Sequence, residues 1–404
     1  MKNLYCDVVI AGCGVAGLYT ALHLSKDKKI LMLSKEDLES CDSMLAQGGI
    51  CVLHDEDDYD SYFEDTMRAG HYENRKESVD IMIRGSRPVI NHLLELGVRF
   101  EKNSDGSLAY TREGAHSRPR ICFHEDITGR EITTTLLSHV KKLSNVTIME
   151  YTTMTDILTA NGCCTGMIAK TGNGETLHIH AADTVMATGG IGGLYQHSTN
   201  FPLLTGDACR IAEKHGVELE HMDYVQIHPT CLYSKKPGRS FLISESARGE
   251  GAILINHKGE RFVNELLPRD VVTHAIEEEM KKEGVDHEYI SFENVPEKII
   301  KGHFPHIYER CLEEGYDILK EPAPIVPAQH YFMGGVHVDS DSQTTMPHLY
   351  AVGETSCNGV HGKNRLASNS LLESLVFAIR AAAKIEKTQK GTENYESNYH
   401  AACC

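Results

Sequence analysis

The sequence predicts an α/β protein in which a Rossmann-type dinucleotide-binding domain is interrupted by an inserted α+β capping domain. Two observations predict this class. The first 35 residues run strand, glycine turn, helix, strand, as a βαβ unit does. The parallel-strand pattern then stops near residue 220 and resumes late in the chain, so the chain leaves the nucleotide domain and returns to it. We therefore expect one domain at 1–219 and 335–390, a capping domain at 220–334 and a polar tail at 391–404.

The individual elements follow from hydrophobic spacing. Residues 8–10 and 30–33 are continuous apolar runs, which are typical of strands buried on both faces. Between them Val15, Leu18 and Leu22 recur at helical spacing. Further along, the pattern predicts a solvated acidic segment at 54–65, helices at 78–97, 130–142 and 368–387, and strands at 146–149, 184–187 and 349–352.

The overall composition argues against several classes of protein. With 57 acidic and 40 basic residues the formal net charge is −17, which disfavours a nucleic-acid partner because phosphates attract a basic surface. No apolar stretch approaches the ~18 residues of a membrane span, and no secretory leader precedes the first strand. The 13 cysteines include no CxxC pair, so we expect reduced thiols, no metal site and a cytoplasmic location.

The glycine turn after the first strand has the spacing Gly12-x-Gly14-x-x-Gly17. The first glycine permits a tight turn, the second lets a pyrophosphate approach the backbone, and the third allows close helix packing. The helix that follows offers free N–H groups to an anion. The predicted dinucleotide site therefore comprises Gly12, Cys13, Gly14, Val15, Ala16 and Gly17.

The end of the second predicted strand departs from the pattern of an NAD site. Proteins that bind NAD usually carry an acidic residue there, which binds the ribose. In this chain Ser34 and Lys35 occupy the position, and Glu36 comes only after them. The sequence therefore favours a different dinucleotide.

Three glycine-rich segments, 43–49, 187–190 and 349–354, identify that dinucleotide. They read Ser-Met-Leu-Ala-Gln-Gly-Gly, Ala-Thr-Gly-Gly and Leu-Tyr-Ala-Val-Gly-Glu, and they resemble the flavin-contacting segments of the succinate dehydrogenase, fumarate reductase and L-aspartate oxidase family. They also occur in the order that the family has. The resemblance implies that the Rossmann-type domain binds FAD.

The resemblance also assigns cofactor contacts by position. It implies that Glu354 binds ribitol or ribose hydroxyls, and that Asp207 lies near the flavin. The N–H groups of Ser370 and Leu371 would stabilise negative charge on the reduced ring, at the start of the last helix. The remaining expected contacts are Lys35, Asp42, Ser43, Ala46, Gln47, Gly48 and Gly49.

Asp42 distinguishes this chain from the respiratory members of the family. Those members attach FAD covalently through a histidine five residues before the glutamine of the Ala-Gln-Gly-Gly turn. The corresponding residue here, five before Gln47, is Asp42, which cannot form that bond. The resemblance therefore implies non-covalent FAD.

Four segments, 226–230, 248–270, 328–331 and 364–369, carry the basic and hydrogen-bonding side chains that a dicarboxylate requires. Carried over from the family residue by residue, His228, His330 and Arg365 would bind the substrate carboxylates. Ser244 would offer them a hydroxyl.

Arg269 would be the catalytic, proton-handling group on the substrate face opposite the flavin. Because an arginine is a poor base in water, it needs a low-dielectric site and a neighbouring carboxylate. Glu245 and Glu250 are both candidates for that neighbour.

The loop at 111–117 resembles that of the L-aspartate oxidases, in which a carboxylate can meet a substrate ammonium; here it would be Glu113. The implied reaction takes a hydride from the α-carbon of L-aspartate to flavin N5 and yields iminoaspartate. Fumarate or oxygen then reoxidises the flavin. Iminoaspartate is the precursor of quinolinate and hence of NAD, which suggests quinolinate synthase as a partner.

Two other interpretations remain open. The first is a fumarate reductase or succinate dehydrogenase flavoprotein, against which Asp42 and Glu113 argue. The second is an FAD-containing scaffold without turnover, which would have no reason to keep four such groups in one cleft. The chain also ends soon after the last predicted helix, so we expect the C-terminal helical domain of the longer family members to be absent.

Overall fold

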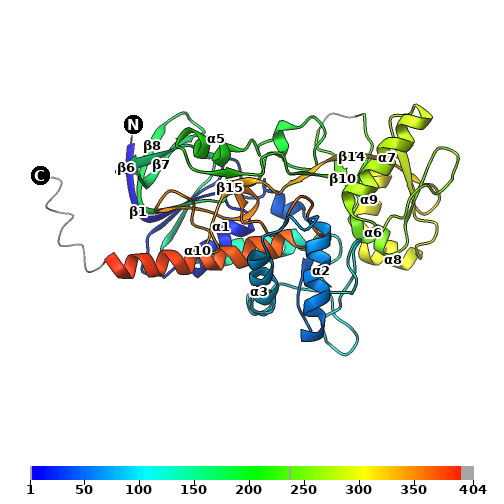
Figure 1. Cartoon of the computed structure of the whole chain (residues 1–404), viewed down its shortest axis with the longest axis horizontal. Helices are drawn as coiled ribbons and strands as arrows, with labels where there is room; N and C mark the ends of the chain where they lie inside the picture. Colours follow the sequence, from blue (N-terminus) through cyan, green and yellow to red (C-terminus); the bar gives the residue numbers. More distant parts are fainter. Residues whose placement is uncertain (1, 236–237, 393–404) are drawn as a thin grey trace, which may run out of the picture.

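Two β-sheets of different kinds organise the protein in the computed structural model, in which residues 2–235 and 238–392 are described (Figure 1). The larger sheet has the order β5-β2-β1-β8-β7-β6, and β16 also pairs with β8. Strands β5, β2, β1, β8 and β16 are parallel, whereas β7 and β6 are antiparallel to their neighbours. The strands are β1 Lys2–Ala11, β2 Ile30–Leu33, β5 Val146–Met149, β6 Thr152–Ala160, β7 Cys163–Thr171, β8 Thr176–Met186 and β16 Leu349–Ala351.

Both faces of this sheet are covered, which explains the continuous apolar runs in the sequence. Along β1, Val8 and Ile10 face the core that includes residues of α1 (Val15–His23), α4 (Thr128–Val140) and α10 (Ser370–Thr392). Val9 and Ala11 point the other way, toward the core shared with α5 (Asp207–Lys214). Figure 1 shows α1 and α10 on one side of the sheet and α5 on the other. Beside α10 lie α2 (Tyr59–Ala69) and α3 (Lys76–Glu95).

The second sheet is antiparallel throughout, with the order β11-β10-β14-β13-β12, and has a separate hydrophobic core. It lies at the right of Figure 1 together with α6, α7, α8 and α9. The bounds are β10 Val225–Leu232, β11 Phe241–Leu242, α6 Glu245–Gly249, β12 Ile253–Ile255, α7 Arg269–Glu283, β13 Glu288–Ser291, α8 Glu297–His303, α9 Pro305–Glu313 and β14 Ala323–Phe332.

A short strand pair stands where the chain enters and leaves this second region. Strand β9 (Leu219–Glu220) pairs antiparallel with β15 (Gly335–His337), which also pairs with β17 (Ser356–Cys357). We retain the domain bounds 1–219 with 335–390, and 220–334, as a proposal. The remaining elements are η1 Asp42–Leu45, β3 Ile50–Cys51, η2 Glu56–Asp58, β4 Ile121–Cys122, η3 Gly192–Leu194 and η4 Gly353–Thr355.

The prediction of a solvated acidic segment at 54–65 is wrong for part of its length. The segment forms η2 and the start of helix α2, and two of its aspartates, Asp58 and Asp65, are buried. Both accept hydrogen bonds from the fully buried Arg120. The charges are therefore paired inside the protein, and the partner lies too far away in the sequence for a local pattern to reveal it.

Within the described part of the chain, no helix is both long and apolar enough to cross a bilayer. The predicted polar tail at 391–404 lies outside the described residues from 393 onward.

Candidate active site

A large cavity extends from the N-terminus of α1 to the inserted sheet, and it encloses about 1660 Å³ including the part open to solvent. Most of the residues predicted for the site line it. They are Gly12, Cys13, Gly14, Val15, Ala16, Lys35, Asp42, Ser43, Ala46, Gln47, Gly48, Gly49, Glu113, Asp207, Ser244, Arg269, His330, Glu354, Arg365, Ser370 and Leu371. Gly17 and His228 are not among the lining residues: Gly17 packs against the Gly12 carbonyl, and the His228 ring packs edge-on against that of His330, with 5.1 Å between the ring centres.

The glycine turn has a conformation that depends on its first glycine. Gly12 has a φ of +118°, and a Cβ placed there would lie 1.9 Å from the carbonyl oxygen of Ala187. Beyond it, the N–H of Val15 donates to Ser43 Oγ at 3.1 Å, which ties the start of α1 to the turn at 43–49. The turn therefore leaves the N-terminus of α1 facing the cavity, where it can meet a phosphate.

Lys35 and Asp207, both predicted to contact the cofactor, pair with each other at the cavity wall. Lys35 Nζ lies 2.8 Å from Asp207 Oδ2 and also donates to the carbonyl of Leu203 at 2.7 Å. This ion pair joins the end of β2 to the first residue of α5.

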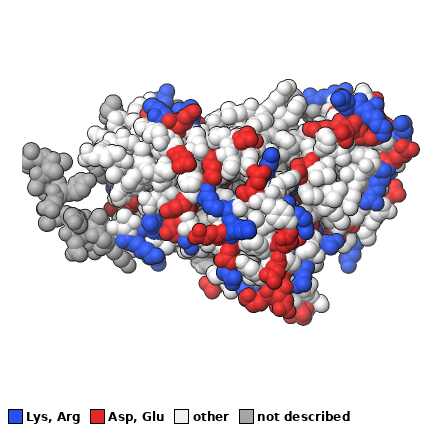
Figure 2. Space-filling view, in the orientation of Figure 1, with Lys and Arg blue, Asp and Glu red and all other residues white. Residues whose placement is uncertain are grey.

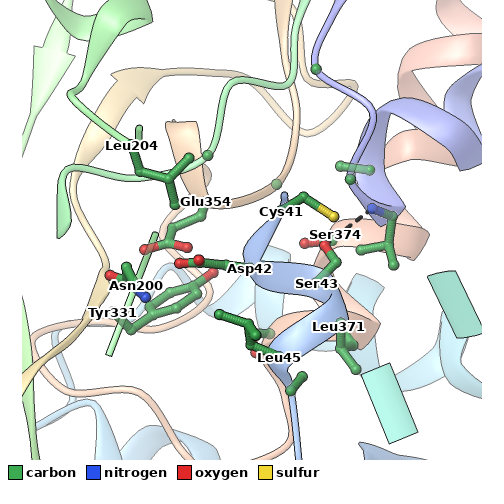
Figure 3. Close-up of a pocket in the computed structure, with 18 of the residues that line it drawn as sticks. Cys41, Asp42, Ser43, Leu45, Asn200, Leu204, Tyr331, Glu354, Leu371 and Ser374 are labelled. Atoms are coloured by element: carbon green, nitrogen blue, oxygen red, sulfur yellow. Dashed lines mark hydrogen bonds between the residues drawn. The ribbon is translucent and has the colours of Figure 1, made fainter. Parts of the chain in front are cut away.

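Two carboxyl groups face each other inside the cavity, as Figure 3 shows for Asp42 and Glu354. Asp42 Oδ1 accepts from the N–H of Phe201 at 2.9 Å, and Glu354 Oε1 accepts from the N–H of Phe332 at 2.9 Å. Burial raises the pKa of Asp42 to about 7. Burial and then the charge of Asp42 raise the pKa of Glu354 to about 8. Asn200 and Tyr331, neither of which was predicted for the cofactor site, lie beside the pair.

The residues of this cavity fit an FAD molecule. At one end of the cavity is the N-terminus of α1, which suits a pyrophosphate. Ser370 and Leu371, at the start of α10, also line the cavity. Asp42 Oδ2 and Gln47 Oε1 are buried acceptors without a partner among the described residues, and hydroxyl or N–H groups of the cofactor would satisfy them. The described residues contain no group of three or more metal-binding side chains.

Arg269 is held by two buried partners. Its Nε lies 2.5 Å from Glu245 Oε2, and its Nη1 donates to Gln226 Oε1 at 2.9 Å. Of the two candidate carboxylates, the neighbour is therefore Glu245, whereas Glu250 pairs with His303 at 3.4 Å. Burial opposes ionisation of Glu245, but the charges of Arg269 and Arg248 outweigh it and lower its pKa.

The predicted carboxylate-binding groups also contact one another. Arg365 Nη2 lies 3.0 Å from His330 Nε2, and Arg365 Nη1 donates to Ser370 Oγ at 2.9 Å. Burial, followed by the charge of Arg269, lowers the pKa of His330 and of His228 well below the usual value. Both imidazoles are therefore neutral at physiological pH.

The tautomer of His228 follows from its backbone contact. The N–H of Thr230 donates to His228 Nδ1 at 3.2 Å, so the proton of the neutral ring resides on Nε2. That Nε2 is buried and has no partner in the described structure. It is a donor that a carboxylate oxygen would satisfy.

Glu113 is buried, with 3% of its surface exposed, and it accepts hydrogen bonds from two serine hydroxyls. Ser246 Oγ donates to Oε1 at 2.8 Å, and Ser368 Oγ donates to Oε2 at 2.5 Å. Neither serine was predictable as a partner of Glu113, because Ser246 and Ser368 lie far from it in the sequence. Ser244 lines the cavity, but its hydroxyl accepts from the N–H of Ser246 and so caps α6.

The Rossmann-type sheet, a cavity suited to FAD, two histidines on the inserted sheet and the buried Arg269 at the start of α7 are the features of a flavoprotein with a site for an anion. The sequence matches the FAD binding domain family over residues 7–371. An L-aspartate oxidase of Clostridium perfringens is 50% identical over 386 residues, which are 95% of this chain and 87% of that protein. One from Clostridium acetobutylicum is 46% identical over 398 residues, or 98% and 91% of the two chains. The chain belongs to the L-aspartate oxidase family.

The fold has a close counterpart among solved structures. A quinol fumarate reductase structure from E. coli superposes with a TM-score of 0.88 at 31% identity, covering 98% of this chain and 74% of that one. The predicted α/β class with a Rossmann-type FAD-binding domain is confirmed. The roles of individual site residues stay a prediction.

We expect FAD to be bound without a covalent link, because Asp42 stands where the respiratory relatives carry histidine. Acid precipitation of the purified protein should release all of the yellow colour into the supernatant. Colour that stays with the pellet after washing would show a covalent bond and would contradict this expectation.

A second expectation concerns the stability of the protein after FAD is removed. The pKa values of about 7 for Asp42 and about 8 for Glu354 mean that the folded apoprotein keeps protons that the unfolded chain loses near pH 4. The unfolded state thus binds fewer protons between about pH 4 and 8, so stability falls as the pH rises through this window. Replacing Asp42 with asparagine should flatten that fall. Melting temperatures of both apoproteins at pH 6 and pH 8 test it, and equal slopes would disprove it.

Proposed function

We propose that this chain catalyses the FAD-dependent oxidation of L-aspartate to iminoaspartate. The observation that carries the proposal is a buried carboxylate, Glu113, in the cavity that also contains Arg269, His330 and Arg365. The donors and cations suit the two carboxylates of a four-carbon acid. A plain dicarboxylate would gain nothing from a negative charge beside it, whereas an amino dicarboxylate brings an ammonium group that needs one.

Each charged group of the substrate has its own binding residues. Arg365 offers a guanidinium fork to one carboxylate, and neutral His228 offers the Nε2–H that lacks an acceptor. Glu113 accepts from the ammonium group. A hydrogen bond to a charged group contributes about 1.5–3 kcal/mol, which is enough to decide between substrates.

When bound, FAD would supply the two-electron acceptor for the hydride of the α-carbon. The ammonium group must also lose a proton before the imine is formed, and Arg269 with Glu245 is the proton-handling pair. Fumarate or oxygen then receives the two electrons. For fumarate, Arg269 donates a proton to the second carbon, while Glu245 and Gln226 hold its guanidinium in position.

A fumarate reductase or succinate dehydrogenase flavoprotein is the less supported alternative, because such a site has no use for Glu113. The proposed product leads toward quinolinate and NAD, so a quinolinate synthase is the partner that this function suggests. We also propose the cytoplasm as its compartment, in keeping with a cysteine pattern typical of reduced thiols.

The direct test is to record the visible spectrum of the purified holoenzyme and to add L-aspartate without oxygen. We expect the flavin bands to bleach, and fumarate to restore them. A spectrum that is unchanged by L-aspartate but responds to succinate would favour the alternative.

Replacing Glu113 with glutamine tests the residue on which the proposal depends. Arg269 and Arg365 would repel an ammonium group in this cavity. The carboxylate of Glu245 is already paired with Arg269, so Glu113 is the one that we expect to bind the ammonium. We expect kcat/KM for L-aspartate to fall by about one to two orders of magnitude. Fumarate reduction should change much less, because fumarate has no ammonium. If both activities fall equally, Glu113 has a structural role instead.

A further inference from the structure

Glu113 must be ionised to bind an ammonium group, yet its surroundings disfavour the charge. Burial raises its pKa, and the nearby carboxylate of Glu245 raises it further, while Arg269 acts in the opposite direction. The charge of Glu113 in turn acts to raise the pKa values of three buried neighbours, Arg248, Arg365 and Cys51. Something close to the carboxylate has to favour the ionised form.

The two serines are suited to this task. Ser246 Oγ donates to one oxygen of Glu113 at 2.8 Å, and Ser368 Oγ donates to the other at 2.5 Å. All three side chains are buried. Hydroxyl donors lower the pKa of Glu113, because they bind the carboxylate better than the acid. They also fix the orientation of the carboxylate plane.

The fold leaves space for Glu113 and brings the two serines to it from different elements. Gly48 leaves room for Glu113, since a Cβ there would lie 2.2 Å from Glu113 Oε1. Ser246 lies in α6 of the inserted region, whereas Ser368 stands just before α10 of the nucleotide-binding region. Glu113 is therefore held by hydroxyls from two parts of the chain that are far apart in sequence.

Ser368 has a conformation that its side chain does not favour. Its φ is +61°, in the left-handed region where glycine is most easily accommodated. Its carbonyl is held there by the N–H of Cys51 at 3.0 Å. A glycine would adopt this backbone with less strain but would lack the hydroxyl. Strain of this kind is typical of residues kept for their side chain.

We propose that Ser246 and Ser368 form a hydroxyl clamp that holds the Glu113 carboxylate in position for the substrate ammonium, and so makes the site prefer amino dicarboxylates over plain ones. The clamp rests on the proposed function of Glu113. The serines are positioning residues, because they act on the substrate through Glu113.

The test uses the holoenzyme and the variants Ser368→Gly, Ser246→Ala and both together, beside Glu113→Gln. Ser368→Gly removes the hydroxyl and relieves the strain of the positive φ, so we expect the variant to fold, and its melting temperature is measured beside the activities. We expect each single change to lower kcat/KM for L-aspartate at pH 7 about tenfold, and the double change about a hundredfold. Fumarate reduction should stay within about twofold. Ser246→Thr, which retains a hydroxyl, should recover most of the loss, and Ser138→Ala at an exposed position of α4 is the matched control.

The pH profile separates the clamp from a merely structural effect. Removing a donor raises the pKa of Glu113 further, so a larger share of the carboxyl is protonated at a given pH. The acid limb of kcat/KM for L-aspartate should therefore move to higher pH in Ser368→Gly and Ser246→Ala, and activity should recover as the pH rises. The profile for fumarate should not move.

The outcomes distinguish the proposed role of the two serines from the proposed role of Glu113 itself. If Glu113→Gln lowers both activities equally, the proposed role of Glu113 fails and the clamp with it. If Glu113→Gln separates the two activities but the serine variants do not, the clamp is wrong while the function stands. An unmoved acid limb in both serine variants also overturns the clamp.

Discussion

Replacing Arg269 with glutamine is expected to lower both L-aspartate oxidation and fumarate reduction by about three orders of magnitude, the usual scale for a lost proton-transfer group. Arg269 lines the cavity, and its hydrogen bonds to Glu245 and Gln226 use Nε and Nη1. Glutamine is neutral and cannot maintain the bonds to Glu245 and Gln226 together. The loss would also leave Glu245 buried without its closest cation.

Single-turnover rates in both directions, measured with the flavin bands, test this expectation. FAD should remain bound, because Arg269 lies in the inserted region at the substrate end of the cavity. The matched control is Arg310→Gln in α9, where the arginine is partly exposed and pairs with Glu313 and Glu314. If Arg269→Gln kept more than about a tenth of either rate, another group would have to handle the proton.

Replacing Gly12 with alanine is expected to abolish FAD binding or to prevent folding. The new Cβ would lie 1.9 Å from the backbone oxygen of Ala187, which cannot turn aside as a side chain can. The φ of +118° at this position is also one that alanine rarely adopts. Both effects act at the point where β1, the turn and α1 meet.

Gly14→Ala is the matched control for Gly12→Ala. Gly14 has a φ of −74°, and its nearest neighbour would be the movable Ser43 Oγ at 3.0 Å. The melting temperature of the apoprotein should fall severely in Gly12→Ala and less in Gly14→Ala. FAD affinity is compared with that of the wild type for Gly12→Ala alone, because Gly14 itself borders the cavity. Equal stability of the two variants would contradict the geometry of the turn.

The sequence by itself determined much of the nucleotide-binding domain. The strands at 8–10 and 30–33 and the helix between them were predictable, because burial on two faces and helical amphipathicity both leave local periodic patterns. The glycine turn was predictable for a related reason, since a positive φ and a close backbone approach restrict the residue at that one position. The flavin segments were found through resemblance, and the family that they indicate is confirmed.

Only the tertiary structure decided which side chains meet. It places Glu245, and not Glu250, beside Arg269. It also buries Asp58 against Arg120, in a segment whose acidic composition predicted exposure to solvent. It also brought Ser246 and Ser368 onto Glu113 from more than a hundred residues away in the sequence. Hydrophobic periodicity shows which face of a single helix or strand a residue lies on. The distance between two loops depends instead on how whole sheets and helices pack, and no local pattern records it.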